Sequence, residues 1–262
     1  MPPKIGIFDS GSGGLSTLAA VRKLIPNAEY FYIGDTKHCP YGTKSPNELL
    51  KITSDVVKRL DKWGATIIII ACNTATTRCI HQLRKRFPKL TFIGTEPALK
   101  VAHDQGSQHP LLLCTPATAH ALSVQRLITQ SYPSSPLFIG TNSPYSPAKP
   151  VSSAQATILP CIGLADTIEQ TLTNPKEIQL LSNDFIPNFS VPESDETKIK
   201  QKLQILFSQL PPNIKYDSII LGCTHYVLIR HLIQPFFPNA TLVDGNQGVA
   251  KYTKLLLSQL HS

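Results

Sequence analysis

The chain has 262 residues, of which 42% are hydrophobic and 16% charged, and its formal net charge is +8. This length suffices for one large domain or two smaller ones, and the composition excludes a disordered or fibrous protein. No apolar run approaches the roughly 20 residues of a membrane helix, and no signal segment precedes the first strand-like run. We therefore expect a soluble, cytoplasmic protein with no membrane partner.

The predicted elements alternate between strands and helices along the chain. The first half gives strand 4–8, helix 15–25, strand 29–33, helix 46–63, strand 65–71, helix 73–87 and strand 91–94. The second half gives strand 109–114, helix 115–130, strand 218–223, helix 224–237, strand 241–245 and helix 249–260. We leave 131–150 and part of 174–196 as irregular connections. Such alternation predicts an α/β fold, with parallel or mixed sheets covered by helices.

Local signals support these boundaries at two points. Ser45, Pro46 and Glu48 form a typical helix start, with a capping serine and a glutamate three residues later. Gly64 then ends that helix. The run of isoleucines at 67–70 is typical of a strand buried on both faces.

The positive charge raises the question of nucleic-acid binding. Lys and Arg are scattered, with one local cluster at 84–86, and no aromatic residues interleave with it as they do in base-stacking surfaces. We interpret this cluster as a solvated helix face and expect no nucleic-acid partner, although a basic binding protein stays open as the weakest alternative. A positive field also attracts small anionic substrates.

Two cysteines share one context. The segments IIIIACNTATT and SIILGCTHYVL each consist of a buried strand, a small residue, a cysteine, polar residues and a helix. Cys72 and Cys223 therefore stand where a strand ends and a helix begins, and the N–H groups and dipole of a helix N-terminus favour a thiolate. One thiolate can serve as a base and the matching thiol as an acid. Asp9, at the end of the first strand, and His225 are candidate partners for Cys72 and Cys223.

Other interpretations of these residues stay open. A single cysteine after a strand is usually a small buried hydrophobe, a lone histidine there usually packs, and Asp9 also suits a turn. Cys72 and Arg78 fit the C-x5-R loop of cysteine phosphatases, in which the thiolate attacks phosphorus. That loop lacks glycine here, and the match leaves Cys223 unexplained. The six cysteines contain no C-x-x-C pair, so neither a disulfide framework nor a zinc site is expected.

Four motifs carry a resemblance to a known family. FDSGSGG, GDTKHCPYGTKS, ACNTAT and GCTHY, in this order, span positions 8 to 226 and resemble glutamate racemase of the aspartate/glutamate racemase superfamily. The resemblance implies two similar α/β domains related by a pseudo-twofold axis, with the active site in the cleft between them. We expect 1–97 plus 246–262 to form the first domain and 98–245 the second.

The resemblance also implies the activity and its residues. The family converts L-glutamate to D-glutamate for peptidoglycan, without a cofactor or a metal ion, and a homodimer is one expected state. Cys72 and Cys223 would be the catalytic acid/bases, with Asp9 assisting the first and His225 the second. The substrate contacts that the resemblance implies are Asp9, Ser10, Tyr41, Gly42, Asn73, Thr74, Thr118, Glu169, Thr224 and His225. A racemase of aspartate or another small amino acid is the nearest alternative.

Overall fold

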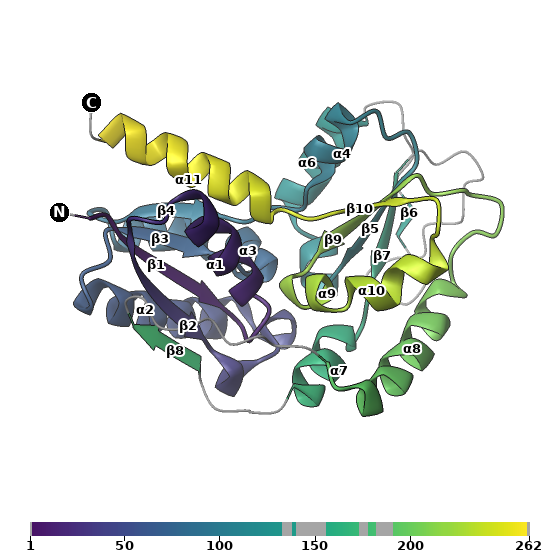
Figure 1. Cartoon of the computed structure of the whole chain (residues 1–262), viewed down its shortest axis with the longest axis horizontal. Helices are drawn as coiled ribbons and strands as arrows, with labels where there is room; N and C mark the ends of the chain where they lie inside the picture. The colour runs from purple at the N-terminus through teal and green to yellow at the C-terminus, as the bar shows by residue number, and fades with distance from the viewer. Residues whose placement is uncertain (1, 133–137, 140–155, 173–177, 182–190, 261–262) are drawn as a thin grey trace. The chain divides into compact units, whose positions relative to one another are not determined.

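The computed structural model describes residues 2–132, 138–139, 156–172, 178–181 and 191–260 (Figure 1). These residues form two compact units. The first unit contains 2–96, 178–181 and 245–260, and the second contains 97–132, 138–139, 156–172 and 191–244. Each unit is built around one five-stranded sheet.

The sheet of the first unit is mixed. Its strands are β1 (Lys4–Asp9), β2 (Glu29–Gly34), β3 (Ile67–Ile70), β4 (Thr91–Gly94) and β8 (Ile178–Leu181), in the order β4-β3-β1-β2-β8. β1 to β4 are parallel, whereas β8 pairs antiparallel with β2 at the edge. Because the parallel strands end at the same edge, the residues that follow them gather there, where ligands bind in such sheets.

Helices cover both faces of this sheet (Figure 1). They are α1 (Leu15–Leu24), α2 (Pro46–Lys62), α3 (Asn73–Arg86) and α11 (Asn246–Leu260), with short 3-10 turns η1 (Thr36–His38) and η2 (Tyr41–Thr43). Ile67 and Ile69 pack with α1 and α11, while Ile68 and Ile70 pack with α2 and α3. The isoleucine run is therefore buried on both faces, as predicted, because successive strand residues point to opposite sides.

The sheet of the second unit is parallel. Its strands are β5 (Pro110–Cys114), β6 (Phe138–Ile139), β7 (Thr157–Pro160), β9 (Ser218–Gly222) and β10 (Thr241–Val243), in the order β10-β9-β5-β7-β6. Its helices are α4 (Leu99–Asp104), α5 (Pro116–Ala119), α6 (Leu122–Ser131), α7 (Leu164–Thr171), α8 (Glu193–Phe207), α9 (Thr224–Leu228) and α10 (Arg230–Ile233), followed by the 3-10 turn η3 (Gln234–Phe236). Residues of α4 and α6 pack against one face of this sheet, on Leu112, Ile158 and Ile220.

The two sheets share a strand arrangement. In each, the first strand of the unit is central, the strand before the cysteine lies next to it, and the following strand lies outside that one. Cys72 after β3 and Cys223 after β9 thus occupy equivalent places at the carboxyl edges of their sheets. The predicted α/β class with similar units is confirmed.

Four expectations need correction. The expected second domain, 98–245, includes residues 178–181, but β8 pairs with β2 in the first sheet. The helix predicted at 115–130 is two helices, because Ala121 is extended (φ −70°, ψ 130°). The helix predicted at 224–237 is divided into α9, α10 and η3. Of the segment expected to be irregular at 131–150, residues 133–137 and 140–150 lie outside the described residues, whereas 138–139 form β6.

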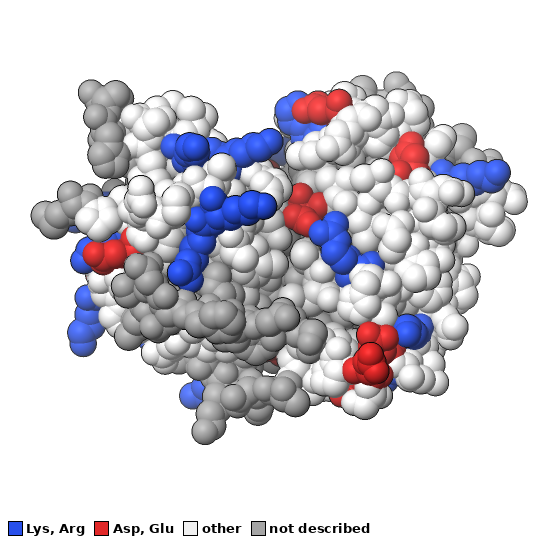
Figure 2. Space-filling model, viewed as in Figure 1, with Lys and Arg blue, Asp and Glu red and all other residues white. Residues whose placement is uncertain are grey.

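The basic side chains are dispersed. Arg84, Lys85 and Arg86 form the last turn of α3 and are exposed, as expected of a solvated helix face. Positive charge there also complements the helix dipole. On the face shown in Figure 2, Lys and Arg form separate groups, several of them beside Asp or Glu. Among the described residues, no helix is both long and apolar enough to span a bilayer.

Candidate active site

Cys72 is the N-cap of α3. Its backbone is extended, and its Sγ accepts a hydrogen bond from the backbone N–H of Ala75 at 3.5 Å. The fourteen-residue helix adds the positive end of its dipole. Asn73 and Thr74 lie buried in the first turn, and the side-chain oxygen Oδ1 of Asn73 has no hydrogen-bond partner among the described residues. An unpaired buried amide oxygen is costly, so this atom suits a donor on a ligand.

Asp9 ends β1, the strand beside β3, and its side chain is fully buried. Its Oδ2 accepts a hydrogen bond from the backbone N–H of Gly14 at 2.9 Å. A Cβ on residue 14 would lie 2.5 Å from the Cβ of Asp9, so this close approach requires glycine. Tyr32 donates from its hydroxyl to the Gly11 carbonyl at 2.7 Å, which fixes the loop that carries the buried Ser10.

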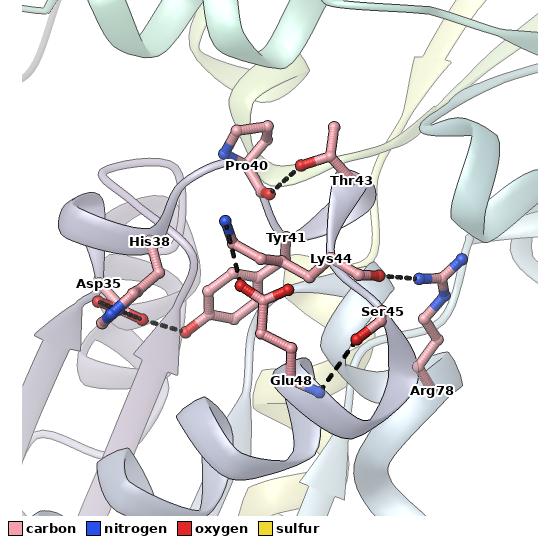
Figure 3. A network of polar contacts seen from close by, with 9 residues as sticks. All are labelled: Asp35, His38, Pro40, Tyr41, Thr43, Lys44, Ser45, Glu48 and Arg78. Atoms are coloured by element: carbon pink, nitrogen blue, oxygen red, sulfur yellow. Dashed lines mark hydrogen bonds and ion pairs between the residues drawn. The ribbon is translucent and has the colours of Figure 1, made fainter.

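Tyr41 is held by a buried carboxylate (Figure 3). Its hydroxyl donates to Asp35 Oδ2 at 2.7 Å, and the two oxygens of Asp35 also lie 2.7 and 2.9 Å from His38 Nδ1. Burial raises the pKa of Tyr41 well above its usual value, and the negative charges of Asp35, Cys72 and Asp9 raise it further. The phenol therefore stays neutral and donates a hydrogen bond to Asp35, which fixes the backbone that continues into Gly42.

Arg78 tests the phosphatase alternative. Residues 73–78 lie within α3, so their N–H groups run along the helix instead of converging on the thiolate. The guanidinium of Arg78 donates through Nη1 to the backbone carbonyl of Lys44 at 2.8 Å (Figure 3). This geometry does not support a phosphate-binding loop at Cys72.

In the second unit, Cys223 forms a chain with two other side chains. The Sγ of Cys223 lies 3.7 Å from His225 Nδ1, and His225 Nε2 lies 2.7 Å from Glu169 Oε2. Glu169 comes from α7, whereas the other two residues come from the start of α9. Since an ionised carboxylate only accepts, Nε2 carries the hydrogen that faces Glu169, and Nδ1 faces the thiol. A thiol, an imidazole and a carboxylate in this order form an activated acid/base set.

Thr118 and Thr224 are buried at the same edge of the second sheet, after β5 and β9. The backbone N–H of Thr118 donates to the side chain of Thr115 at 3.3 Å, and the hydroxyl of Thr115 donates to Thr118 Oγ1 at 3.1 Å. The predicted residues divide between the two units: Asp9, Ser10, Tyr41, Gly42, Cys72, Asn73 and Thr74 belong to the first, and Thr118, Glu169, Cys223, Thr224 and His225 to the second.

Three other thiols are kept protonated. Burial raises the pKa values of Cys79 and Cys114 above the usual value, and raises that of Cys161 to about 12. A protonated thiol is a poor nucleophile, so these residues act as small core groups. Cys39 is half-buried.

Sequence reasoning missed two groups at the site. Asp35, which holds Tyr41, follows β2 at the carboxyl edge of the first sheet, and the rule that sites form at such edges could have identified it. The spacing of Arg78 from Cys72 suggests only a phosphate contact, and nothing in the local sequence indicates that Arg78 reaches Lys44. Glu169 is implied by the family resemblance alone, and its carboxylate contacts His225.

Comparisons with known proteins identify the family, although no family model matches the chain. The glutamate racemase of Leptospira borgpetersenii is 34% identical over 254 residues, covering 96% of this chain and 81% of that protein. The glutamate racemase of Clostridium perfringens is 32% identical over 259 residues, covering 97% of this chain and 83% of that protein.

Solved structures share the fold. Escherichia coli glutamate racemase, in complex with L-glutamate and the activator UDP-MurNAc-Ala, gives a TM-score of 0.73 at 24% identity and covers 98% of this chain and 83% of that one. The RacE1 isoform of Bacillus anthracis glutamate racemase gives a TM-score of 0.74 at 20% identity, and the match covers 98% of this chain and 82% of that one. With relatives above 30% identity along nearly its whole length, this chain belongs to the glutamate racemase family.

Proposed function

We propose that Cys72 and Cys223 are the opposed acid and base with which this protein interconverts L- and D-glutamate. One observation carries the proposal: both thiols follow the equivalent strand of a similar sheet, and each sulfur contacts a polar nitrogen, the Ala75 N–H for Cys72 and the His225 imidazole for Cys223. Inversion at carbon needs a base on one face and an acid on the other. The proposal therefore requires the two sulfur atoms to flank the α-carbon of bound substrate.

The proton balance is simple. A thiolate at one cysteine removes the α-proton, and the thiol of the other delivers its proton to the opposite face. The first cysteine ends as a thiol and the second as a thiolate, ready for the other enantiomer. Because the carbanion-like transition state gains charge, it needs polar groups placed in advance in a site that excludes water.

The two thiols receive unequal help. Cys72 has the N–H groups and dipole of α3, with Asp9 at the end of the neighbouring strand. Cys223 precedes a helix of only five residues, but His225 faces its sulfur and Glu169 holds the imidazole. We propose that Asp9 and His225 assist the proton transfers, and that Glu169 orients His225.

The remaining predicted residues would bind the substrate. Glutamate carries two carboxylates and an ammonium group, which hydroxyl, amide and backbone N–H groups can hold. The amide oxygen of Asn73, which has no hydrogen-bond partner in the described part of the chain, suits the ammonium group. We propose that the other contacts come from Asp9, Ser10, Tyr41, Gly42, Thr74, Thr118, Thr224 and His225, together with the Glu169 carboxylate.

The setting of the reaction completes the proposal. Francisella tularensis glutamate racemase was solved with D-glutamate, and its structure gives a TM-score of 0.70 with this chain. D-Glutamate is a peptidoglycan precursor, so we place the reaction in the cytoplasm, where such precursors are made. We propose a homodimer, which light scattering would show as twice the 28.7 kDa of one chain.

Proton exchange tests the proposal directly. Cofactor-free protein in D2O should remove the α-proton signal of glutamate in NMR spectra, and Cys72→Ser and Cys223→Ser should each abolish racemisation. Cys79→Ser, which changes a buried thiol of α3 outside the site, should retain the activity. If the wild-type protein exchanged the α-proton of aspartate but not that of glutamate in a substrate panel, aspartate would replace glutamate as the substrate. Dependence on Cys72 alone would refute the two-thiol mechanism.

A further inference from the structure

Arg78 joins two segments of the first unit. It lies on α3, whose start carries Cys72, Asn73 and Thr74, and its guanidinium reaches the carbonyl of Lys44, just after Tyr41 and Gly42 (Figure 3). We infer that Arg78 is a positioning residue that holds the Tyr41–Gly42 segment against α3, so that both segments present their groups to one substrate molecule. This inference rests on the proposed function.

The bond from Arg78 holds the backbone at the end of the turn η2, which contains Tyr41 and Gly42. The N–H of Lys44 donates to the carbonyl of Tyr41 at 3.2 Å and closes the turn η2, while the carbonyl of Lys44 accepts from Arg78 at 2.8 Å. Both ends of the Lys44 residue are therefore bonded. At the other end of the turn, the Tyr41 hydroxyl is bonded to Asp35 at 2.7 Å. Gly42 lies between these two attachments and has no side chain of its own to hold it.

The position of Arg78 on the helix suits this task. It is four residues after Thr74, so the two side chains leave the same face of α3. Its side chain is half-buried, and a charged donor forms a stronger hydrogen bond to a carbonyl than a neutral one. A helix is rigid over one turn, so a movement of α3 is passed on to the Tyr41–Gly42 segment. The arginine of the C-x5-R pattern thus has a role in this chain that does not involve phosphate.

The same helix offers a matched control. Arg84 also donates from its guanidinium to a backbone carbonyl of the first unit, that of Phe92 at 3.0 Å. Phe92 lies in β4, outside both substrate segments. Arg78→Met and Arg84→Met therefore remove the same kind of bond from one helix, and only the first touches the segment that carries Tyr41 and Gly42.

The test compares steady-state kinetics with amide exchange. Arg78→Met should raise KM for glutamate about tenfold with a smaller change in kcat, because the contact serves ground state and transition state alike. It should also speed hydrogen exchange in a peptide covering residues 41–45. Arg84→Met should do neither, and Arg78→Lys, which keeps one donor, should recover part of the KM.

The outcomes separate this inference from the proposed function. Equal KM values for active Arg78→Met and Arg84→Met proteins would overturn the role of Arg78 and leave the two-thiol mechanism standing. Faster exchange at 41–45 with an unchanged KM would also overturn it, because the segment would then not bind substrate. Absence of racemisation in the wild-type protein would remove the proposed function and this inference together. A lower melting temperature for Arg78→Met with kinetics like those of Arg84→Met would show a structural role only.

Discussion

Glu169→Gln isolates the charge behind His225. The amide oxygen of glutamine can still accept a hydrogen bond from Nε2, so the imidazole keeps its orientation while the negative charge is lost. The pair is 2.7 Å apart, His225 is 1% exposed and the Glu169 side chain 11%. A charge-assisted bond in such a setting is worth about 2 kcal/mol and the neutral bond that replaces it about 1 kcal/mol. The difference of about 1 kcal/mol corresponds to a loss of about fivefold in kcat/KM.

A second pair in the same unit supplies the control. Glu196 Oε1 lies 3.2 Å from His231 Nε2, but the His231 side chain is 52% exposed. Racemisation by Glu169→Gln and Glu196→Gln can be measured by circular dichroism, starting from each enantiomer of glutamate. Melting temperatures of both variants are measured alongside. The two enantiomers have equal free energy in water, so kcat/KM must fall equally in both directions. Activity of Glu169→Gln equal to that of Glu196→Gln would refute the role of the carboxylate in catalysis.

Further predictions concern the structure around the first thiol and the buried acids. Tyr41→Phe removes a donor to the buried Asp35, so urea unfolding should show a loss of about 1–3 kcal/mol and the KM for glutamate should rise. Gly14→Ala brings a Cβ to 2.5 Å from that of Asp9, and we expect about 1–3 kcal/mol of destabilisation; unchanged stability would contradict the close packing. The raised pKa values of Tyr41 and Cys161, the latter about 12, favour the neutral groups in the folded state. Their stabilisation is complete below the pKa values of the unfolded chain, about 8.5 for a thiol and 10 for a phenol, and is lost as the pH rises towards the folded values. Urea unfolding should therefore give a lower free energy at pH 10 than at pH 8, by about 1–2 kcal/mol for the thiol alone.

The parts of the fold that the sequence predicts are those with local signals. The isoleucines at 67–70 indicate a strand covered on both faces, and Ser45 caps α2 through the backbone N–H of Glu48 at 3.3 Å, as its spacing predicts. The repeated strand–cysteine–helix context identifies the equivalent places of Cys72 and Cys223. Each signal lies within about ten residues of the feature that it predicts.

The parts that escaped depend on distant partners. β8 pairs with β2, nearly 150 positions earlier in the chain, and nothing in its four residues states which sheet it joins. The break between α5 and α6 contains neither Gly nor Pro, the usual signals of a helix end. Arg78 reaches a carbonyl 34 positions away, so its partner depends on how α3 packs beside η2.

Because α11 is the last element of the chain, the first unit cannot complete its core until the end of synthesis. This helix supplies Val249 and Ala250 to the core that contains α1, and Asn246 accepts a hydrogen bond from Thr17 at 2.7 Å. A ribosome makes α1 first and these residues more than two hundred positions later. Until α11 is made, the face of the first sheet that α1 and α11 share is therefore covered only in part, while all the described residues of the second unit have already been made by Asp244. The unit that begins the chain is thus the last to complete its core, although domains generally fold in order from the N-terminus.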